Sequence, residues 1–200
     1  MVNYKLCAFA DEADKALSGQ IRAMQENGIE YLEMRGVNGI NVAKLTAAEA
    51  KDAAAQLKAG GIKVWSLGSP AGKTPITDPF DFEKEQFKRL LETADIVGAH
   101  AIRLFSFYGT DGKAEYRDEV MERLSRFVEM AKGSGVVLCH VDAVHAPHFQ
   151  IFDAVFLHGA DLTRKGLIRL ISKGTKLIID HIFLLLSQKT RHVYEFYTPE

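Results

Sequence analysis

The chain has 200 residues, of which 47% are hydrophobic and 26% are charged, a balance typical of a single well-cored soluble domain. Its formal net charge of −1 gives no electrostatic reason to expect binding to nucleic acid or to an anionic membrane surface. The two cysteines, Cys7 and Cys139, lie far apart in apolar runs, which argues against a disulfide scaffold or a zinc ribbon and favours buried, reduced thiols.

No segment of the sequence has the pattern of an export signal or a membrane span. Acidic residues follow the first apolar run directly from Asp11 onward, unlike a signal peptide. The apolar run 177–186 is interrupted by Asp180 and His181 and is shorter than the roughly 20 apolar residues that a bilayer requires. We therefore expect a soluble, cytoplasmic protein.

Short apolar runs alternate along the chain with stretches of helical periodicity. The apolar runs predict buried strands at residues 4–10, 29–34, 62–67, 101–107 and 136–140. The stretches between them predict helices at 18–27, 46–59, 81–97 and 116–132. Thr46 with Glu49 three residues later is a capping-box pattern, and it marks the start of the second helix.

This alternation predicts parallel strands joined by helical crossovers. Two architectures fit it, an open doubly wound sheet and a (β/α) barrel. A doubly wound fold would place a glycine-rich phosphate turn after the first strand, where this chain has Asp11 and Glu12. Polar residues at the carboxyl end of every predicted strand favour the barrel, whose active site is built from those ends. We predict an α/β fold of the parallel (β/α) TIM-barrel type.

Six short segments at these strand ends resemble the sugar phosphate isomerase/epimerase family of xylose-isomerase-like TIM barrels. They are CAFADE (7–12), LEMR (32–35), SLGSP (66–70), GK (72–73), RLFSFY (103–108) and LCH (138–140). The resemblance covers residues 1–140, or five βα units. It implies a divalent metal (Mn, Mg, Co or Zn) at the barrel mouth, bound to adjacent oxygens of a ketose or ketose phosphate. A pair of carboxylates would then move a proton on and off the neighbouring carbon.

The chain departs from the family pattern after residue 140. The pattern continues Glu-Asn-Glu, with the first glutamate a metal ligand, and this chain has Val141 in that place. The run 175–179 weakly resembles a sixth strand, and the 60 residues after position 140 are too few for three more βα units. We therefore predict one domain over 1–200, with five TIM-like units in 1–140 and a divergent segment, 141–200, that is a candidate sixth unit. The barrel would be incomplete and its active site truncated and impaired.

Histidines and aspartates in the later part of the chain are candidate metal ligands, because both residue types bind divalent metals. His140, Asp142, His145 and His148 fall within nine residues. The other interpretation is a polar loop with accidental histidines, stiffened by Pro147. The candidate metal ligands are His140, Asp142, His145, Asp180 and His181.

The other candidate site residues lie at the earlier strand ends. We assign candidate catalytic roles to Asp11, Glu12 and Asp142, and substrate-binding roles to Glu33, Arg35, Lys73, Arg103 and Ser106. Asp11 and Glu12 suit a base or a hydroxyl acceptor, and equally a solvated helix start. Glu33 and Arg35 are two residues apart on one strand face, so they either orient substrate or form a structural ion pair.

The two remaining basic residues differ in the strength of their signal. Lys73 is a phosphate contact or a surface lysine, since its loop lacks the GxxxxGK[ST] spacing. Arg103 lies within an apolar strand, and a buried arginine needs an acidic partner or an anionic ligand.

Three functions follow from these patterns. The first is a sugar (phosphate) isomerase/epimerase that uses metal-assisted proton transfer on a small carbohydrate. The alternative is a non-catalytic partial-barrel binding or assembly protein, a candidate homo-oligomer because an open barrel leaves strand edges to cover. The weaker alternative is a metal-dependent endonuclease-like phosphodiesterase, because a related branch of the superfamily repairs abasic DNA. The near-neutral charge argues against nucleic acid as a partner, and we expect no membrane partner.

Overall fold

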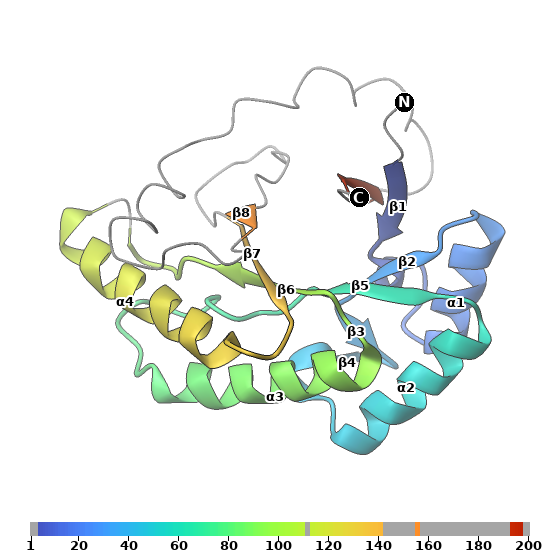
Figure 1. The fold of residues 1–200 in the computed structure, drawn as a ribbon, viewed down its shortest axis with the longest axis horizontal. Coiled ribbons are helices and arrows are strands. Elements are labelled where there is room, and N and C mark those ends of the chain that lie inside the picture. The colour runs from blue at the N-terminus through green and yellow to red at the C-terminus, as the bar shows by residue number, and fades with distance from the viewer. Residues whose placement is uncertain (1–3, 111–112, 142–154, 157–192, 198–200) are drawn as a thin grey trace.

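The computed structural model describes residues 4–110, 113–141, 155–156 and 193–197. A seven-stranded sheet runs through them in the order β8-β7-β6-β5-β2-β1-β9 (Figure 1). Its centre is five parallel strands: β1 (Tyr4–Ala8), β2 (Tyr31–Met34), β5 (Lys63–Leu67), β6 (Ala101–Phe105) and β7 (Val137–Val141). They lie side by side in chain order, as in a (β/α) barrel, which confirms the predicted α/β class.

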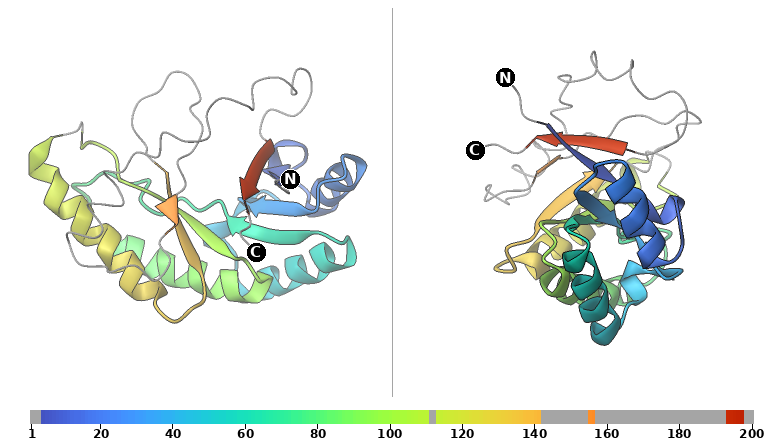
Figure 2. Two further views of the ribbon diagram at one scale, coloured as in Figure 1. Left: turned by 45° about the horizontal axis from the view of Figure 1, so that its top comes forward. Right: turned by 90° about the vertical axis from the view of Figure 1, so that its right-hand side faces the viewer.

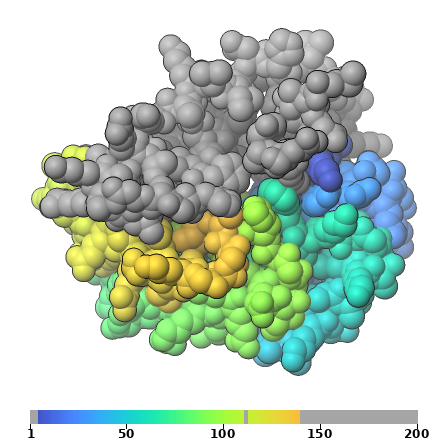
Figure 3. Space-filling model, in the orientation of Figure 1, coloured from blue at the N-terminus to red at the C-terminus, as the bar shows by residue number. Residues whose placement is uncertain are grey.

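Four α-helices connect these strands and lie along one side of the sheet (Figures 1 and 2). They are α1 (Leu17–Glu26), α2 (Ala47–Ala59), α3 (Asp81–Val97) and α4 (Ala114–Ala131). Adjacent helices contact one another, and α2, α3 and α4 form a continuous surface in Figure 3. A doubly wound sheet would carry helices on both faces. The one-sided arrangement is therefore that of a barrel wall.

The core lies between the sheet and the helices because each strand alternates its side chains between two faces. On β2, Leu32 and Met34 are fully buried toward the helices, while Tyr31 and Glu33 occupy the other face. A register shift after Leu32 places Glu33 opposite Ser66 of β5. The inner face therefore receives polar side chains at its carboxyl edge.

Two predicted strands end earlier than the sequence pattern indicated. The first stops at Ala8, because the chain turns into the short 3-10 helix η1 (Ala10–Glu12). The fourth stops at Phe105, since Phe107 adopts a φ of 69° and its N–H donates to the carbonyl of Gly72 over 2.9 Å. Both shortenings place the polar residues in loops at the carboxyl edge of the sheet.

Short elements absent from the sequence prediction complete the described part. A hairpin of β3 (Gly36–Val37) and β4 (Ile40–Asn41) turns through an Asn-Gly pair, and the 3-10 helix η2 (Val42–Lys44) follows. At the sheet edges, β8 (Val155–Phe156) pairs antiparallel with β7, and β9 (Val193–Tyr197) pairs antiparallel with β1.

Two other predictions can be compared with the structure only over the described residues. The candidate sixth strand at 175–179 lies outside them, so the division of the chain at residue 140 stays a prediction. Among the helices that the structure does describe, none is long and apolar enough to cross a membrane.

The capping box at the start of α2 gives a direct test of local stability. Thr46 Oγ1 accepts from the Glu49 N–H at 3.2 Å, and Glu49 Oε2 accepts from the Thr46 N–H at 2.8 Å. We expect Thr46→Ala to lower the free energy of unfolding by about 1 kcal/mol, because the backbone donor loses its acceptor. Urea denaturation measures this effect. Thr46→Ser, which keeps the hydroxyl, should retain most of the stability, and equal losses in both variants would contradict the capping role.

Candidate functional site

Six of the predicted site residues meet at the carboxyl edge of the parallel sheet. The three cationic ones alternate with two aromatic rings that the sequence prediction missed, Phe9 and Phe105. Arg35 Cζ lies 4.9 Å from the centre of the Phe9 ring. Arg103 Cζ lies 5.0 Å from the centre of the same ring and 5.2 Å from the centre of the Phe105 ring. Lys73 Nζ completes the series at 4.3 Å from the Phe105 ring. We call Arg35, Phe9, Arg103, Phe105 and Lys73 the cation–aromatic ladder.

Glu33 is the buried carboxylate of this site. Its Oε1 lies 2.9 Å from Arg103 Nη1, and the two side chains are only 16% and 11% exposed. Burial raises the pKa of Glu33, and the nearby Arg103 and Arg35 charges and a hydrogen bond from Ser66 offset this only in part. Within the described residues, Oε1 is buried and accepts no hydrogen bond. Glu33 therefore combines a raised proton affinity with a buried oxygen that is ion-paired to Arg103 but accepts no hydrogen bond within the described residues.

Arg35 pairs with the two acids of η1 instead of with Glu33. Its Nε lies 2.8 Å from Asp11 Oδ2, and its Nη2 lies 3.1 Å from Glu12 Oε1. Glu33 takes Arg103 as its partner, from a strand two places along the sheet. The structure thus places Asp11 and Glu12 at the strand ends, held by an arginine.

Lys73 lies in a loop that is packed tightly against β6. Ser69 Oγ donates to the Arg103 carbonyl at 2.5 Å, and the Phe105 N–H donates to the Ala71 carbonyl at 2.9 Å. Burial, followed by the positive charges of Arg103 and Arg35, lowers the pKa of Lys73. No carboxylate forms an ion pair with Lys73 in the part of the chain that the structure describes. Lys73 is therefore the cation of the ladder that no ion pair within the described residues matches.

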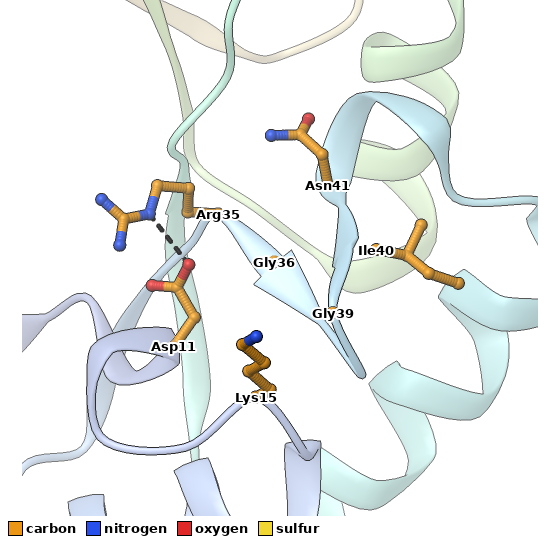
Figure 4. A pocket seen from close by; sticks show the side chains of 7 residues that line it. All are labelled: Asp11, Lys15, Arg35, Gly36, Gly39, Ile40 and Asn41. Atoms are coloured by element: carbon orange, nitrogen blue, oxygen red, sulfur yellow. Dashed lines mark hydrogen bonds and ion pairs between the residues drawn. The ribbon is translucent and has the colours of Figure 1, made fainter.

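A pocket of about 310 Å³ opens beside Arg35, next to the β3–β4 hairpin (Figure 4). Its polar walls include Asp11, Lys15 and Asn41. In Figure 4 the Lys15 amine points into this pocket and Ile40 points away from it. The pocket shares Asp11 and Arg35 with the site, so it extends the polar surface at the strand ends.

The remaining candidates are placed in part or not at all. Ser106 follows β6 directly and is half-buried. The backbone of His140 lies in β7 and pairs with Leu104. The other candidate metal and catalytic residues lie outside the described residues: Asp142, His145, Asp180 and His181.

The two cysteines lie close to Glu33 and behave as buried thiols. Burial, and then the Glu33 charge, raises the pKa of Cys139 to about 12, and the pKa of Cys7 rises for the same two reasons. Burial therefore disfavours the thiolate, which is the reactive form, at both residues. Both are free cysteines, as expected from the sequence.

The described side chains do not fit a metal centre by themselves. Nowhere in residues 4–110 and 113–139 do three or more His, Cys, Asp or Glu side chains gather in a way that could hold a metal. Glu33 also lies beside the positive charges of Arg103 and Arg35, which disfavour a nearby dication. A metal there would need ligands from outside these described side chains.

The fold and the position of these side chains define a (β/α)-barrel protein with a polar site at the carboxyl ends of its strands. Residues 21–140 match the sequence profile of the family described as xylose isomerase-like TIM barrel. This match spans more than half of the chain, which belongs to that family. The resemblance seen in the strand-end motifs is thereby confirmed.

Solved structures show the same fold at low sequence identity. A xylose isomerase domain protein from Alicyclobacillus acidocaldarius is 15% identical with a TM-score of 0.54, covering 83% of this chain and 58% of its own. A D-psicose 3-epimerase solved with D-fructose is 16% identical with a TM-score of 0.52, covering 74% and 55%. A xylose isomerase-like TIM barrel protein from Mycobacterium smegmatis, in complex with magnesium, is 16% identical with a TM-score of 0.51, covering 67% and 53%.

These comparisons bear on the fold and on the length of the chain. The chain spans about half the length of solved structures that it matches. No curated protein matches it. The family includes isomerases and epimerases that act on small sugars, and some of its members bind divalent metal.

Proposed function

We propose that the chain binds a ketose or ketose phosphate at the cation–aromatic ladder and serves metal-assisted isomerisation or epimerisation. The observation that carries this proposal is Glu33, a mostly buried carboxylate of raised pKa whose Oε1 accepts no hydrogen bond within the described residues. A sugar hydroxyl would supply the hydrogen bond that the ion pair with Arg103 leaves unmade. The site lies where barrel enzymes of this type bind their substrates, at the carboxyl ends of the strands.

The donors and acceptors around Glu33 suit a polyhydroxylated ligand. Arg35, Lys73 and Arg103 supply hydrogen-bond donors that orient sugar oxygens or a phosphate. Glu33 and Asp11 supply acceptors for hydroxyl groups, and burial raises the pKa of Glu33 toward the range of a proton acceptor. The ring faces of Phe9 and Phe105 contact all three cations and hold them in place.

The metal belongs to the proposal and not to the described site. Its candidate ligands are His140, Asp142, His145, Asp180 and His181, with Mn, Mg, Co or Zn as candidate ions. A bound dication of this kind would stabilise negative charge on a carbonyl oxygen of the sugar. Val141, in the place of a ligand in the family pattern, is the observation against a complete ligand set.

Sugar binding through Glu33 makes the first functional prediction. In calorimetric titrations with D-fructose and D-fructose 6-phosphate, with and without Mn²⁺, we expect Glu33→Gln to weaken binding about tenfold or more. The reason is that a hydrogen bond to a charged group contributes roughly 1.5–3 kcal/mol. Glu30→Gln is the matched control, since Glu30 is exposed and precedes the same strand. Equal affinity of wild type and Glu33→Gln would contradict the role of Glu33.

Proton transfer is tested separately from binding. We expect the wild-type chain with Mn²⁺ to exchange the hydrogen next to the sugar carbonyl for deuterium in D₂O, as followed by NMR. Binding without exchange would instead support the non-catalytic binding protein, which Val141 favours. Absence of both binding and exchange would contradict both proposals.

A further inference from the structure

Glu83, on the first turn of α3, is a buried charge that the sequence pattern does not mark as functional. The residue is only 2% exposed. Its Oε2 accepts from the Gly72 N–H at 3.1 Å, and its Oε1 accepts from Thr74 Oγ1 at 2.8 Å. The two donors are the chain neighbours of Lys73, one on each side. One carboxylate thus ties down the segment that carries Lys73.

The same segment is held from its other side by β6. A Cβ atom on Gly72 would overlap the carbonyl oxygen of Phe105, so the two backbones are in direct contact. The Phe107 N–H donates to the Gly72 carbonyl at 2.9 Å, and the Tyr108 N–H donates to the Thr74 carbonyl at 2.9 Å. The backbone at Lys73 is therefore held from two sides, by the Glu83 carboxylate and by the end of β6 with the residues that follow it.

From this geometry we propose that Glu83 is a positioning residue that holds Lys73 over Phe105 and so completes the cation–aromatic ladder. Burial of a carboxylate is unfavourable unless its oxygens are paired, and here both are paired to the loop. An apolar side chain would pack against the core without that cost. The carboxylate instead fixes the position of Lys73. The role of Lys73 in binding substrate rests on the proposed function above.

The position of Lys73 can be observed without any activity. Reductive ¹³C-methylation of the lysines gives one NMR signal for each amine, and Lys73→Arg identifies the signal of Lys73. In the wild-type chain we expect this signal to be displaced by the Phe105 ring, 4.3 Å from Nζ, and to titrate below the other lysines. In Glu83→Met neither the Gly72 N–H nor the Thr74 hydroxyl has a side-chain acceptor at this position, so we expect the ring-induced displacement to be lost. The titration should then move up to that of the exposed lysines.

Two further variants separate positioning from general stability. Thr74→Val removes one donor and should reduce the ring-induced displacement, while Thr74→Ser should restore it. This pair tests the proposal even where Glu83→Met does not fold. Thr93→Val is the matched control, since Thr93 is buried on the same helix, about 15 Å along it from Glu83. The proposal is overturned where Lys73 keeps its signal in folded Glu83→Met and Thr74→Val, or where Thr93→Val moves that signal equally.

The proposed function has its own outcome in the same experiment. Addition of D-fructose 6-phosphate to the wild-type chain should move the Lys73 signal. A signal that responds to Glu83→Met but not to this ligand supports positioning by Glu83 and removes Lys73 from the substrate site.

Discussion

Replacement of Arg103 by methionine should lower the free energy of unfolding by about 3 kcal/mol at neutral pH. Removing one partner of a buried ion pair leaves the other charge buried and uncompensated, which typically costs about 3–5 kcal/mol. Glu33 and Arg103 are 16% and 11% exposed, so the pair is largely withdrawn from water. We expect the lower end of that range, because Ser66 and Arg35 still stabilise the Glu33 carboxylate in the variant.

The loss should depend on pH in a defined direction. The pKa of Glu33 is raised above 4.5 in the folded protein, so its contribution to stability is fully present below pH 4.5 and is lost as pH rises through the raised pKa. Arg103 is the strongest influence that lowers this pKa, and its removal raises the pKa further. Arg103→Met should therefore be more destabilising at pH 8 than at pH 3, well below 4.5, where Glu33 is largely protonated in the unfolded chain and, because its pKa is raised, more so in the folded one.

Urea denaturation at the two pH values measures the effect, and a double variant provides its control. Glu33→Gln combined with Arg103→Met removes both charges, so it should recover part of the stability that Arg103→Met loses at pH 8. A loss that is the same at both pH values, or a double variant no more stable than Arg103→Met, would show that packing and not the buried charge accounts for the change.

The sequence predicts the strand-end positions of this site correctly for a simple geometric reason. Parallel strands in chain order bring their carboxyl ends to one edge of the sheet, so residues at those ends must approach one another. Asp11, Glu33, Lys73 and Arg103 are accordingly found together. Strand periodicity alone is sufficient for this step.

The pairing of charges depends on features that periodicity does not contain. Spacing along β2 suggested an ion pair between Glu33 and Arg35, yet Glu33 pairs with Arg103 on β6. Small residues on the intervening strand and its end, Ser66 and Gly68, leave room for this pair across β5; a Cβ atom on Gly68 would lie 3.2 Å from Glu33 Oε1. Choice of partner is thus set by side-chain volume between strands.

The residues that the sequence prediction missed, Phe9, Phe105 and Glu83, occur in sequence patterns that favour a structural role. Phe9 and Phe105 end apolar runs and are buried, so they look like core residues, although their rings also contact the cations of the site. Glu83 follows a helix start, where an acid is explained by the helix dipole. Its role becomes visible only from the two hydrogen bonds that it accepts from a loop nine to eleven residues earlier in the chain.

The second large effect is expected from Gly72→Ala, which should destabilise the chain by about 3 kcal/mol. Gly72 has a φ of 77°, and the left-handed conformation costs a residue with a Cβ atom about 1–2 kcal/mol. The added Cβ also overlaps the backbone carbonyl of Phe105, which cannot rotate away as a side chain would, and such overpacking costs about 1–3 kcal/mol more. Because relief of the overlap must move the loop off β6, Lys73 should also leave the Phe105 ring.

Gly98→Ala separates the two contributions. Gly98 ends α3 with a φ of 68°, and a Cβ atom there meets nothing within 4 Å, so it should cost only the conformational term of about 1–2 kcal/mol. Urea denaturation should rank Gly72→Ala well below Gly98→Ala in stability, and the NMR signal of Lys73 should move only in Gly72→Ala. Equal stabilities, or a Lys73 signal unchanged in Gly72→Ala, would mean that the loop is not pressed against β6. The cation–aromatic ladder would then not depend on a glycine at this point.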